Sequence, residues 1–296
     1  MKVKYYLVIL FIFLITLFFR PLSVNAKSLT PKAERKLGFN YYYGRNGVKQ
    51  NYAKAIYWFR KAADQGSSKA QVDLGVIYYL GYGVKQNYSK AFYWYRKAAE
   101  KGNSYGQYEL GDAYYLGYGV PRNYSKAVFW WKKAADQGNS DAQVSLGGIF
   151  GLGRGVPRNY SKAVFWWKKA ADQGNSNGQA ELGAAYYYSR GVPRNYSKAV
   201  FWWKKAADQG NSNGQVYLGN TYYFGRGVSK NYSKAIFWWK KAADQGNSNG
   251  QVRLGIAYYL GYGVKQNYSK GLYWLNKSAA QGNPQAKEFL NKIKNQ

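Results

Sequence analysis

The sequence has no cysteine, no histidine and a single methionine in 296 residues. Without these side chains the chain cannot form a disulfide, a thiolate nucleophile, an imidazole base or a zinc finger. Catalytic pairs of serine or cysteine with histidine are therefore excluded, and a metal ion would need oxygen ligands alone. We expect neither a cofactor nor a metal site.

Acidic residues are also scarce, since 13 Asp and Glu stand against 44 Lys and Arg for a formal charge of +31. Hydrophobic residues make up 46% of the chain and aromatic residues 20%. A disordered chain of such high charge would be poor in aromatic residues, because it could not bury enough apolar surface to fold. The composition therefore predicts a folded, strongly basic protein.

Only one stretch is long and apolar, and it lies near the N-terminus. It runs without a charged residue from Tyr5 to Phe19, after two lysines, and leads to a small-residue site that ends at Ala26. This run is shorter than the roughly 20 residues that span a bilayer. The pattern is typical of a signal peptide over residues 1–26, cleaved after Ala26. We expect a periplasmic or secreted protein with no membrane span after cleavage; an uncleaved anchor bounded by Arg20 and Pro21 is the alternative.

A repeat of 36 residues dominates the rest of the chain. The dipeptide Leu-Gly begins at Leu37, Leu74, Leu110, Leu146, Leu182, Leu218 and Leu254, with a spacing of 37 once and 36 thereafter. A second motif, Asn-Tyr-(Ser/Ala)-Lys, recurs in the same phase. Regular self-similarity at this period is typical of stacked repeat proteins.

Each unit is predicted to hold two helices. In the second copy they cover residues 68–80 and about 88–101, and each stops at a glycine. Such a pair cannot bury its apolar face alone, so the copies must stack. We predict an all-α fold, an α/α solenoid (superhelix) of seven 36-residue helix-turn-helix repeats over residues 27–296. The segment 284–296 is similar to one more first helix and is expected to be a C-terminal capping helix.

Three motifs recur in each unit: Gly-x-Gly-Val, then Ala-x-x-Trp-(Phe/Trp)-x-x-Ala-Ala-x-x-Gly, then Gln-x-x-Leu-Gly-x-x-Tyr-Tyr. Together they resemble the Sel1-like repeats, relatives of the tetratricopeptide repeats, over about residues 31–290. The chain departs from that pattern in having Asn where the family has Asp before the second helix, and in lacking the cysteines of one branch. No Ser-x-x-Lys occurs, so the β-lactam binding described for that branch is not carried over. The resemblance implies an interaction scaffold, and exported bacterial members include host-contact factors and immunity proteins.

Differences among the copies indicate which surface is free to recognise a partner. At 100° per residue, the repeated Gln, Tyr and Gly of the first helix lie near its Leu, whereas the residues before and two after Leu vary on the opposite arc. The resemblance places that arc in a concave groove, beside a tyrosine column that Gly151 interrupts. The candidate partner-binding residues are Asp73, Val76, Tyr79, Glu109, Asp112, Tyr115, Asp141, Glu181, Tyr187, Tyr217, Asn220, Tyr223, Arg253 and Tyr259. Packing of the tyrosines against neighbouring repeats is the alternative.

Acidic residues gather on the first helices of copies two to five, which in a basic protein suggests a basic segment of another protein or peptide as partner. Solvated surface charge is the alternative reading. Glu109 and Asp112 lie one helical turn apart and could form an acid–base pair. An open groove does not shield a reaction from water, so we expect that the protein is not an enzyme.

The second helix carries a basic outer side. Its candidate polyanion-binding residues are Lys126, Lys132, Lys133, Lys162, Lys168, Lys169, Lys198, Lys204 and Lys205. Neighbouring helices lie about 8 to 10 Å apart, so such columns of charge could bind a polyanion with strong salt dependence. An anionic envelope polymer or lipid is therefore the alternative partner, while export disfavours nucleic acid. The leading prediction is a non-enzymatic protein–protein interaction scaffold or regulator, and an immunity protein against an exported toxin is a further alternative.

Overall fold

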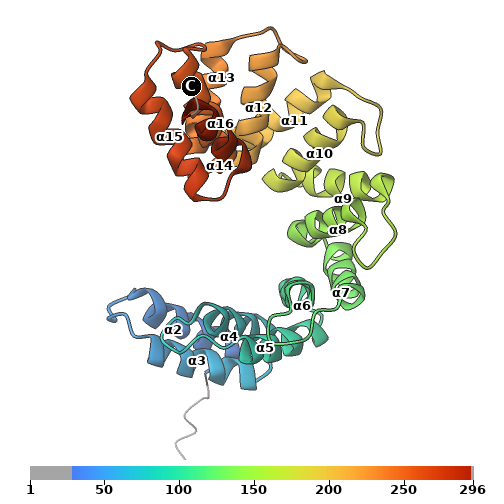
Figure 1. The fold of residues 1–296 in the computed structure, drawn as a ribbon. Coiled ribbons are helices and arrows are strands. Elements are labelled where there is room, and N and C mark those ends of the chain that lie inside the picture. Colours follow the sequence, from blue (N-terminus) through green and yellow to red (C-terminus); the bar gives the residue numbers. More distant parts are fainter. Residues whose placement is uncertain (1–28, 295–296) are drawn as a thin grey trace, which may run out of the picture. The chain divides into compact units, whose positions relative to one another are not determined.

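The computed structural model describes residues 29–294, so the predicted signal peptide and its cleavage site lie outside the described residues. Within that range the chain forms fifteen α-helices and no strand (Figure 1). The first helices of the repeats are α2 (Pro31–Tyr43), α4 (Ser68–Leu80), α6 (Ser104–Leu116), α8 (Ser140–Leu152), α10 (Ser176–Tyr188), α12 (Ser212–Phe224) and α14 (Ser248–Leu260). The second helices are α3 (Tyr52–Asp64), α5 (Tyr88–Glu100), α7 (Tyr124–Asp136), α9 (Tyr160–Asp172), α11 (Tyr196–Asp208), α13 (Tyr232–Asp244) and α15 (Tyr268–Ala280), and α16 (Pro284–Lys294) follows.

The predicted fold class, an all-α solenoid of seven helix pairs, is confirmed. The chain divides into two compact units, one up to Ala70 and one from Gln71 onward. In the larger unit each helix from α5 to α16 packs on the next in the chain, and α8, α10, α12 and α14 also contact one another in turn. No helix between residues 29 and 294 is both long and apolar enough to cross a bilayer.

Short-range capping chemistry fixes the ends of the helices. The side-chain oxygen of Asn123 accepts a hydrogen bond from the backbone N–H of Lys126 at 2.9 Å, and the corresponding Asn of each other repeat does the same for its second helix. Most first helices end at a residue in the left-handed conformation, such as Gly117 with φ 82°. Glycine adopts this conformation without strain. These caps explain why every helix of the seven repeats has the same length.

The glycine of each Leu-Gly pair packs against a large side chain from the second helix. A Cβ at Gly111 or Gly147 would overlap the indole of Trp131 or Trp167, respectively. Trp131 is 3% exposed, and the leucine beside each of these two glycines is almost fully buried. The repeated tryptophan of the second helix is therefore the largest side chain of the core, and it can pack there because the facing residue has no side chain.

Candidate functional site

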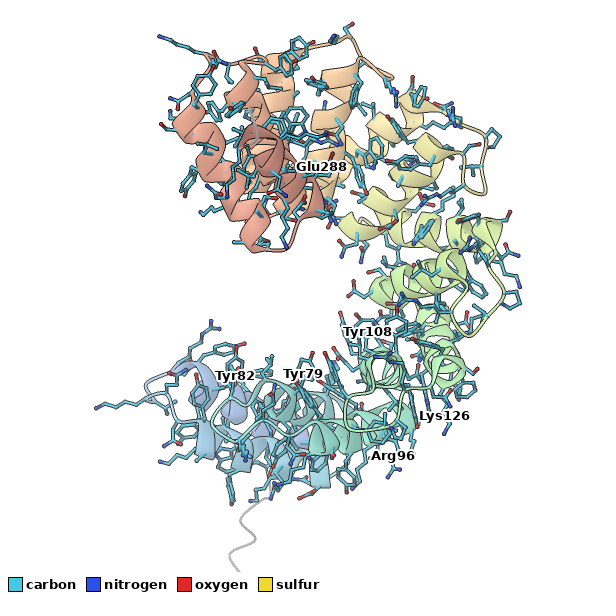
Figure 2. The ribbon with its side chains drawn as sticks, viewed as in Figure 1. Tyr79, Tyr82, Arg96, Tyr108, Lys126 and Glu288 are labelled. Atoms are coloured by element: carbon cyan, nitrogen blue, oxygen red, sulfur yellow. The ribbon has the colours of Figure 1, made fainter. Side chains whose placement is uncertain are left out.

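The predicted partner-binding residues lie on the first helices, and we call their common surface in the larger unit the first-helix face. Figure 2 shows Tyr79 and Tyr108 on the side of the helix stack opposite Arg96 and Lys126. The labelled tyrosines of the first helices thus lie on one side of the stack, and these two basic residues of α5 and α7 lie on the other. The two candidate surfaces of the sequence analysis are therefore separate.

The tyrosines of the column form part of the solenoid's own packing. The ring of Tyr115 lies 5.3 Å from that of Trp131 and 5.4 Å from that of Tyr124. Its hydroxyl accepts a hydrogen bond from Arg154 of the next repeat at 2.8 Å. Tyr187, Tyr223 and Tyr259 also pack on rings of their own or the following repeat. Each of these tyrosines is half-buried, so one face of the ring supports the scaffold and the remainder is exposed.

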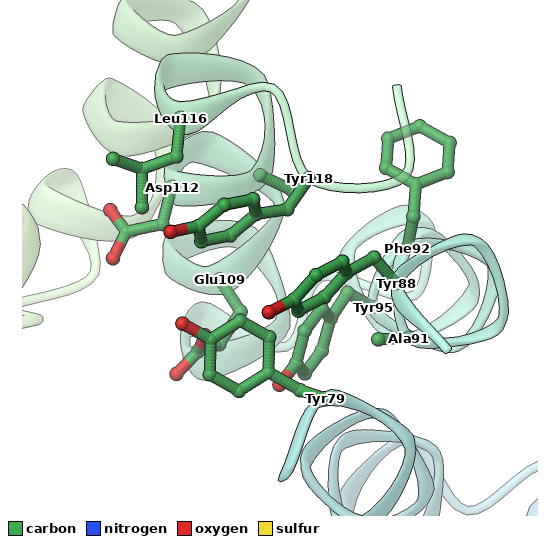
Figure 3. A pocket seen from close by; sticks show the side chains of 10 residues that line it. Tyr79, Tyr88, Ala91, Phe92, Tyr95, Glu109, Asp112, Leu116 and Tyr118 are labelled. Carbon is green, nitrogen blue, oxygen red and sulfur yellow. The ribbon is translucent and has the colours of Figure 1, made fainter. Parts of the chain in front are cut away.

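Two carboxylates of α6 meet tyrosine rings in a small cavity of about 80 Å3, which we call the acidic hollow (Figure 3). Glu109 and Asp112 project from α6 toward the same side as the hydroxyl ends of Tyr79 and Tyr118. The residues that line the hollow are Tyr79, Tyr88, Ala91, Phe92, Tyr95, Glu109, Asp112, Ala113, Leu116 and Tyr118. Both carboxylates are half-buried, although the helical wheel indicated an open surface at their positions.

Burial changes the protonation of this pair. It raises the pKa of Glu109 to about 7, with further contributions from the negative charges of Asp112 and Asp141. Burial also raises the pKa of Asp112 to about 6, against the hydrogen bonds from Tyr108 and Trp131 that lower it. The charged forms are disfavoured because the surrounding rings replace water, and the residues that line the hollow include no Lys or Arg. A cation supplied from outside would therefore be stabilised in the hollow.

The other predicted residues have varied surroundings. Asp141 is exposed, and its carboxylate accepts a hydrogen bond from Asn175, the capping residue of the next first helix, at 2.8 Å. Partial desolvation raises the pKa of Glu181, which Arg190 counteracts. Tyr217 stacks on Trp203 with 4.9 Å between ring centroids. The remaining predicted residues of the first-helix face, which are Asp73, Val76, Asn220 and Arg253, are all half-buried.

The lysines of the predicted polyanion site are exposed, and several already have intramolecular partners. Lys132 and Lys168 form ion pairs with Asp136 and Asp172 four residues later on the same helix, at 2.5 and 2.9 Å. Six of the other predicted lysines lie over aromatic rings. Cation–ring contacts are formed by Lys126, Lys133, Lys162, Lys169, Lys198 and Lys205. The basic face is therefore an ordered array of lysines and rings.

Sequence reasoning missed two sets of residues that shape the first-helix face. The indole N–H of Trp131 donates to Asp112 at 2.8 Å, and that of Trp239 donates to Asn220 at 3.1 Å. The second set follows the end of each first helix, where Tyr118 packs on Tyr79 and an arginine takes that place in the next three repeats. The available signal was that this repeat position holds Tyr in copies two, three and seven and Arg in copies four to six.

The arrangement offers binding chemistry. No group of three or more Asp or Glu between residues 29 and 294 is placed to hold a metal ion. The acidic hollow combines two carboxylates of raised pKa with hydroxyl groups, which can attract a cation and form hydrogen bonds.

Comparisons with known proteins agree with this architecture. The Sel1 repeat model matches residues 31–67, 68–103, 104–139, 140–175, 176–211, 212–247 and 248–283. Among solved structures, c5321, a protective antigen of uropathogenic Escherichia coli with an SLR fold, is 39% identical with a TM-score of 0.75, over 90% of this chain and 57% of that one. A Sel1 repeat protein of Oxalobacter formigenes is 30% identical with a TM-score of 0.75, over 83% and 96% of the two chains. HRD3A of Arabidopsis thaliana, a component of an ERAD-associated E3 ubiquitin-protein ligase, is 36% identical over 63 residues, which are only 9% of its length.

Proposed function

This chain belongs to the Sel1 repeat family, and from that premise we propose that it is an exported, non-enzymatic scaffold or regulator that binds a basic segment of a partner protein on its first-helix face. Helical repeat proteins of this kind offer extended surfaces for binding other chains. The solenoid supplies a rigid support, and the variable first-helix residues supply the specificity. Export remains a proposal drawn from the pattern of residues 1–26.

The acidic hollow is the observation that carries this proposal. In a chain of charge +31, the pair Glu109 and Asp112 is half-buried among tyrosines and has a raised pKa. A Lys or Arg side chain of a partner would restore the ionised state of these carboxylates and form charge-assisted hydrogen bonds. The tyrosines around them provide large contact surfaces with little rotamer entropy to lose.

The test compares charge reversals on the two faces. Glu109→Lys places a positive charge in the hollow, whereas Asp172→Lys makes the same change on the exposed outer side of α9, where Asp172 pairs with Lys168. Affinity for the captured partner should fall at least tenfold for Glu109→Lys and stay within a factor of two for Asp172→Lys. Equal affinity of both variants and the unchanged protein would show that the hollow takes no part.

A second candidate function rests on the basic face. Phe129, Phe165, Phe201 and Phe237 are each about half exposed, and a lysine lies 4.6 to 4.8 Å from each ring centroid. This regular pattern of rings and cations fits an anionic envelope polymer. Its affinity for dextran sulfate should fall steeply with salt and should weaken in the triple variant Lys133→Gln, Lys169→Gln, Lys205→Gln. Weak binding by the unchanged protein at low salt would remove this candidate.

A further inference from the structure

The fourth repeat lacks side chains at two places where other repeats build the first-helix face. Gly148 occupies the position of Asp112 and Asn220, and Gly151 occupies the position of the tyrosine column. Beside these glycines lies a cavity of about 230 Å3, which we call the fourth-repeat pocket. It is lined by Val144, Gly148, Gly151, Leu152, Tyr160, Trp167, Glu181 and Arg190.

The first missing group is a hydrogen-bond acceptor. Trp131 and Trp239 donate their indole N–H groups to Asp112 and Asn220, the residues two positions after the repeated leucine. Trp167 is 6% exposed, and its Nε1 has no hydrogen-bond partner among the residues that the structure describes. In repeat five, where Ala184 stands at the position of Gly148, the indole N–H of Trp203 donates to the Ala180 carbonyl at 2.9 Å, whereas Trp167 forms no such bond in the described part of the chain. A buried donor without a partner costs about 1 to 3 kcal/mol.

The second missing group is a phenol ring. In repeats three, five and six the column tyrosine packs on the tryptophan of its own repeat, with centroids 5.2 to 5.4 Å apart. Gly151 leaves the corresponding edge of Trp167 without that ring, and the nearest Trp167 atom lies 3.3 Å from where a Cβ of residue 151 would be. The ring position is therefore open space beside an aromatic surface.

The third missing group is the hydroxyl of that ring. Arg154 and Arg226 donate to the hydroxyls of Tyr115 and Tyr187, the column tyrosines of the preceding repeats. Arg190 holds the same position after α10, where its target would be residue 151. It lies instead over the rings of Tyr188 and Tyr160, at 5.1 and 6.0 Å from the centroids.

We propose that the fourth-repeat pocket binds a tyrosine side chain of the partner protein, whose ring packs on Trp167 and whose hydroxyl accepts a hydrogen bond from Arg190. This inference rests on the proposed function, since it names one residue that the partner must carry. A cavity of about 150 Å3 can hold a benzene molecule, so 230 Å3 is sufficient for a phenol ring. The tyrosine completes a pattern that the other repeats satisfy within the chain.

Two substitutions supply the missing groups from the chain itself and should close the pocket without harming the fold. A Cβ at Gly148 meets no atom within 4 Å, so Gly148→Asn can accept from Trp167 as Asn220 accepts from Trp239. Gly151→Tyr restores the column with only a close approach to Trp167. Both variants are expected to be at least as stable as the unchanged protein, which separates loss of binding from loss of folding.

The experiment titrates N-acetyl-L-tyrosinamide into the 15N-labelled protein and follows the indole N–H signal of Trp167, assigned from its absence in Trp167→Phe. We expect saturable movement of that signal, at least tenfold weaker binding of N-acetyl-L-leucinamide, and no movement in Gly148→Asn or Gly151→Tyr. A Trp167 signal that does not move, or that moves equally with the leucine compound, would overturn the proposal.

This outcome is independent of the test of the proposed function. If Glu109→Lys abolishes capture while N-acetyl-L-tyrosinamide leaves Trp167 unaffected, the pocket proposal fails and the proposed function of the first-helix face stands. If the tyrosine compound binds and Glu109→Lys captures normally, the pocket is a ligand site and the acidic hollow is not the partner's binding surface.

Discussion

At the residue scale, one glycine and one serine on the same helix test how the first-helix face differs from the core. A Cβ at Gly147 would overlap Trp167, whereas Ser145 is half-buried at the edge of a cavity beside Trp131. Gly147→Leu should therefore lower the free energy of unfolding by about 3 kcal/mol, the upper end of what overpacking a filled site costs. Ser145→Leu should change it by less than about 1 kcal/mol. Urea unfolding of the two variants measures the difference, and equal losses would contradict the assignment of Gly147 to the core.

The carboxylates of the acidic hollow give a pH dependence of stability with a definite sign. Their pKa values are raised in the folded chain, from 4.5 to about 7 for Glu109 and from 3.8 to about 6 for Asp112. Folding therefore favours their protonated forms, so the stability that they contribute at low pH is lost as the pH rises from about 4 to 7. Glu109→Gln with Asp112→Asn should remove this decline. The amide oxygen introduced at position 112 can still accept from Trp131, as Asn220 accepts from Trp239.

Melting temperatures of the unchanged protein and the double variant between pH 4 and 8 test this prediction. The melting temperature of the double variant should rise relative to that of the unchanged protein as the pH rises. Parallel curves would mean that the two carboxylates are hydrated like surface groups. Asp136→Asn, which removes an exposed carboxylate on α7, is the matched control and should leave the pH profile of the unchanged protein intact.

At the scale of one helix, the Asn that begins each second helix can be replaced in two instructive ways. Asn159 accepts from the backbone N–H of Lys162 at 2.9 Å. Asn159→Ala should cost about 1 kcal/mol, because that N–H loses its side-chain acceptor. Asn159→Asp keeps the acceptor and adds a negative charge at the positive end of the helix dipole, so it should be neutral or stabilising by a few tenths of a kcal/mol.

Thermal unfolding of these two variants provides the measurement. Equal destabilisation by Asp and Ala would show that Asn159 acts through its amide group and not as a helix cap. The result also bears on why this chain has Asn where similar repeats have Asp. If Asn159→Asp leaves the stability unchanged, either residue caps the helix equally well and the two differ only in the charge they add to the surface.

The elements of this protein were predictable because seven copies repeat the same local signals. Asn before each second helix and Gly after most first helices fix the helix ends, and the structure places α4 and α5 at Ser68–Leu80 and Tyr88–Glu100, within one residue of the sequence-based limits. The surroundings of the candidate site were less accessible. The wheel identified the arc that carries Glu109 and Asp112, but it could not show that tyrosines from α4, from α5 and from the loop after α6 remove water from them.

Contacts between repeats explain why the surroundings of the candidate site could not be predicted. The repeated Gln of one first helix, such as Gln143, donates to the Ala135 carbonyl and accepts from Gln173 thirty residues later, at 3.2 and 2.8 Å. Tyr118 and Arg154, which follow α6 and α8, each contact the column tyrosine of the preceding repeat. A single-helix wheel contains no information about such neighbours, and for this reason the fourth-repeat pocket was visible in the sequence only as two glycines.

At the scale of the whole molecule, different roles fall to two surfaces of one solenoid. The acidic first-helix face is proposed to recognise a partner, and the basic second-helix face is the alternative binding surface. The two predict different salt dependence, because contacts that are partly buried among tyrosines are screened less than exposed lysines that face a polyanion.

The most direct measurement is therefore capture from an envelope extract by the immobilised protein, washed at about 0.1 M and then about 1 M salt, where the Debye length falls from about 10 to 3 Å. We predict one protein that survives the high-salt wash on the unchanged chain and on Asp172→Lys but is absent on Glu109→Lys. Retained material that is lost entirely with salt, and equally from all three, would contradict the first-helix face as the binding surface.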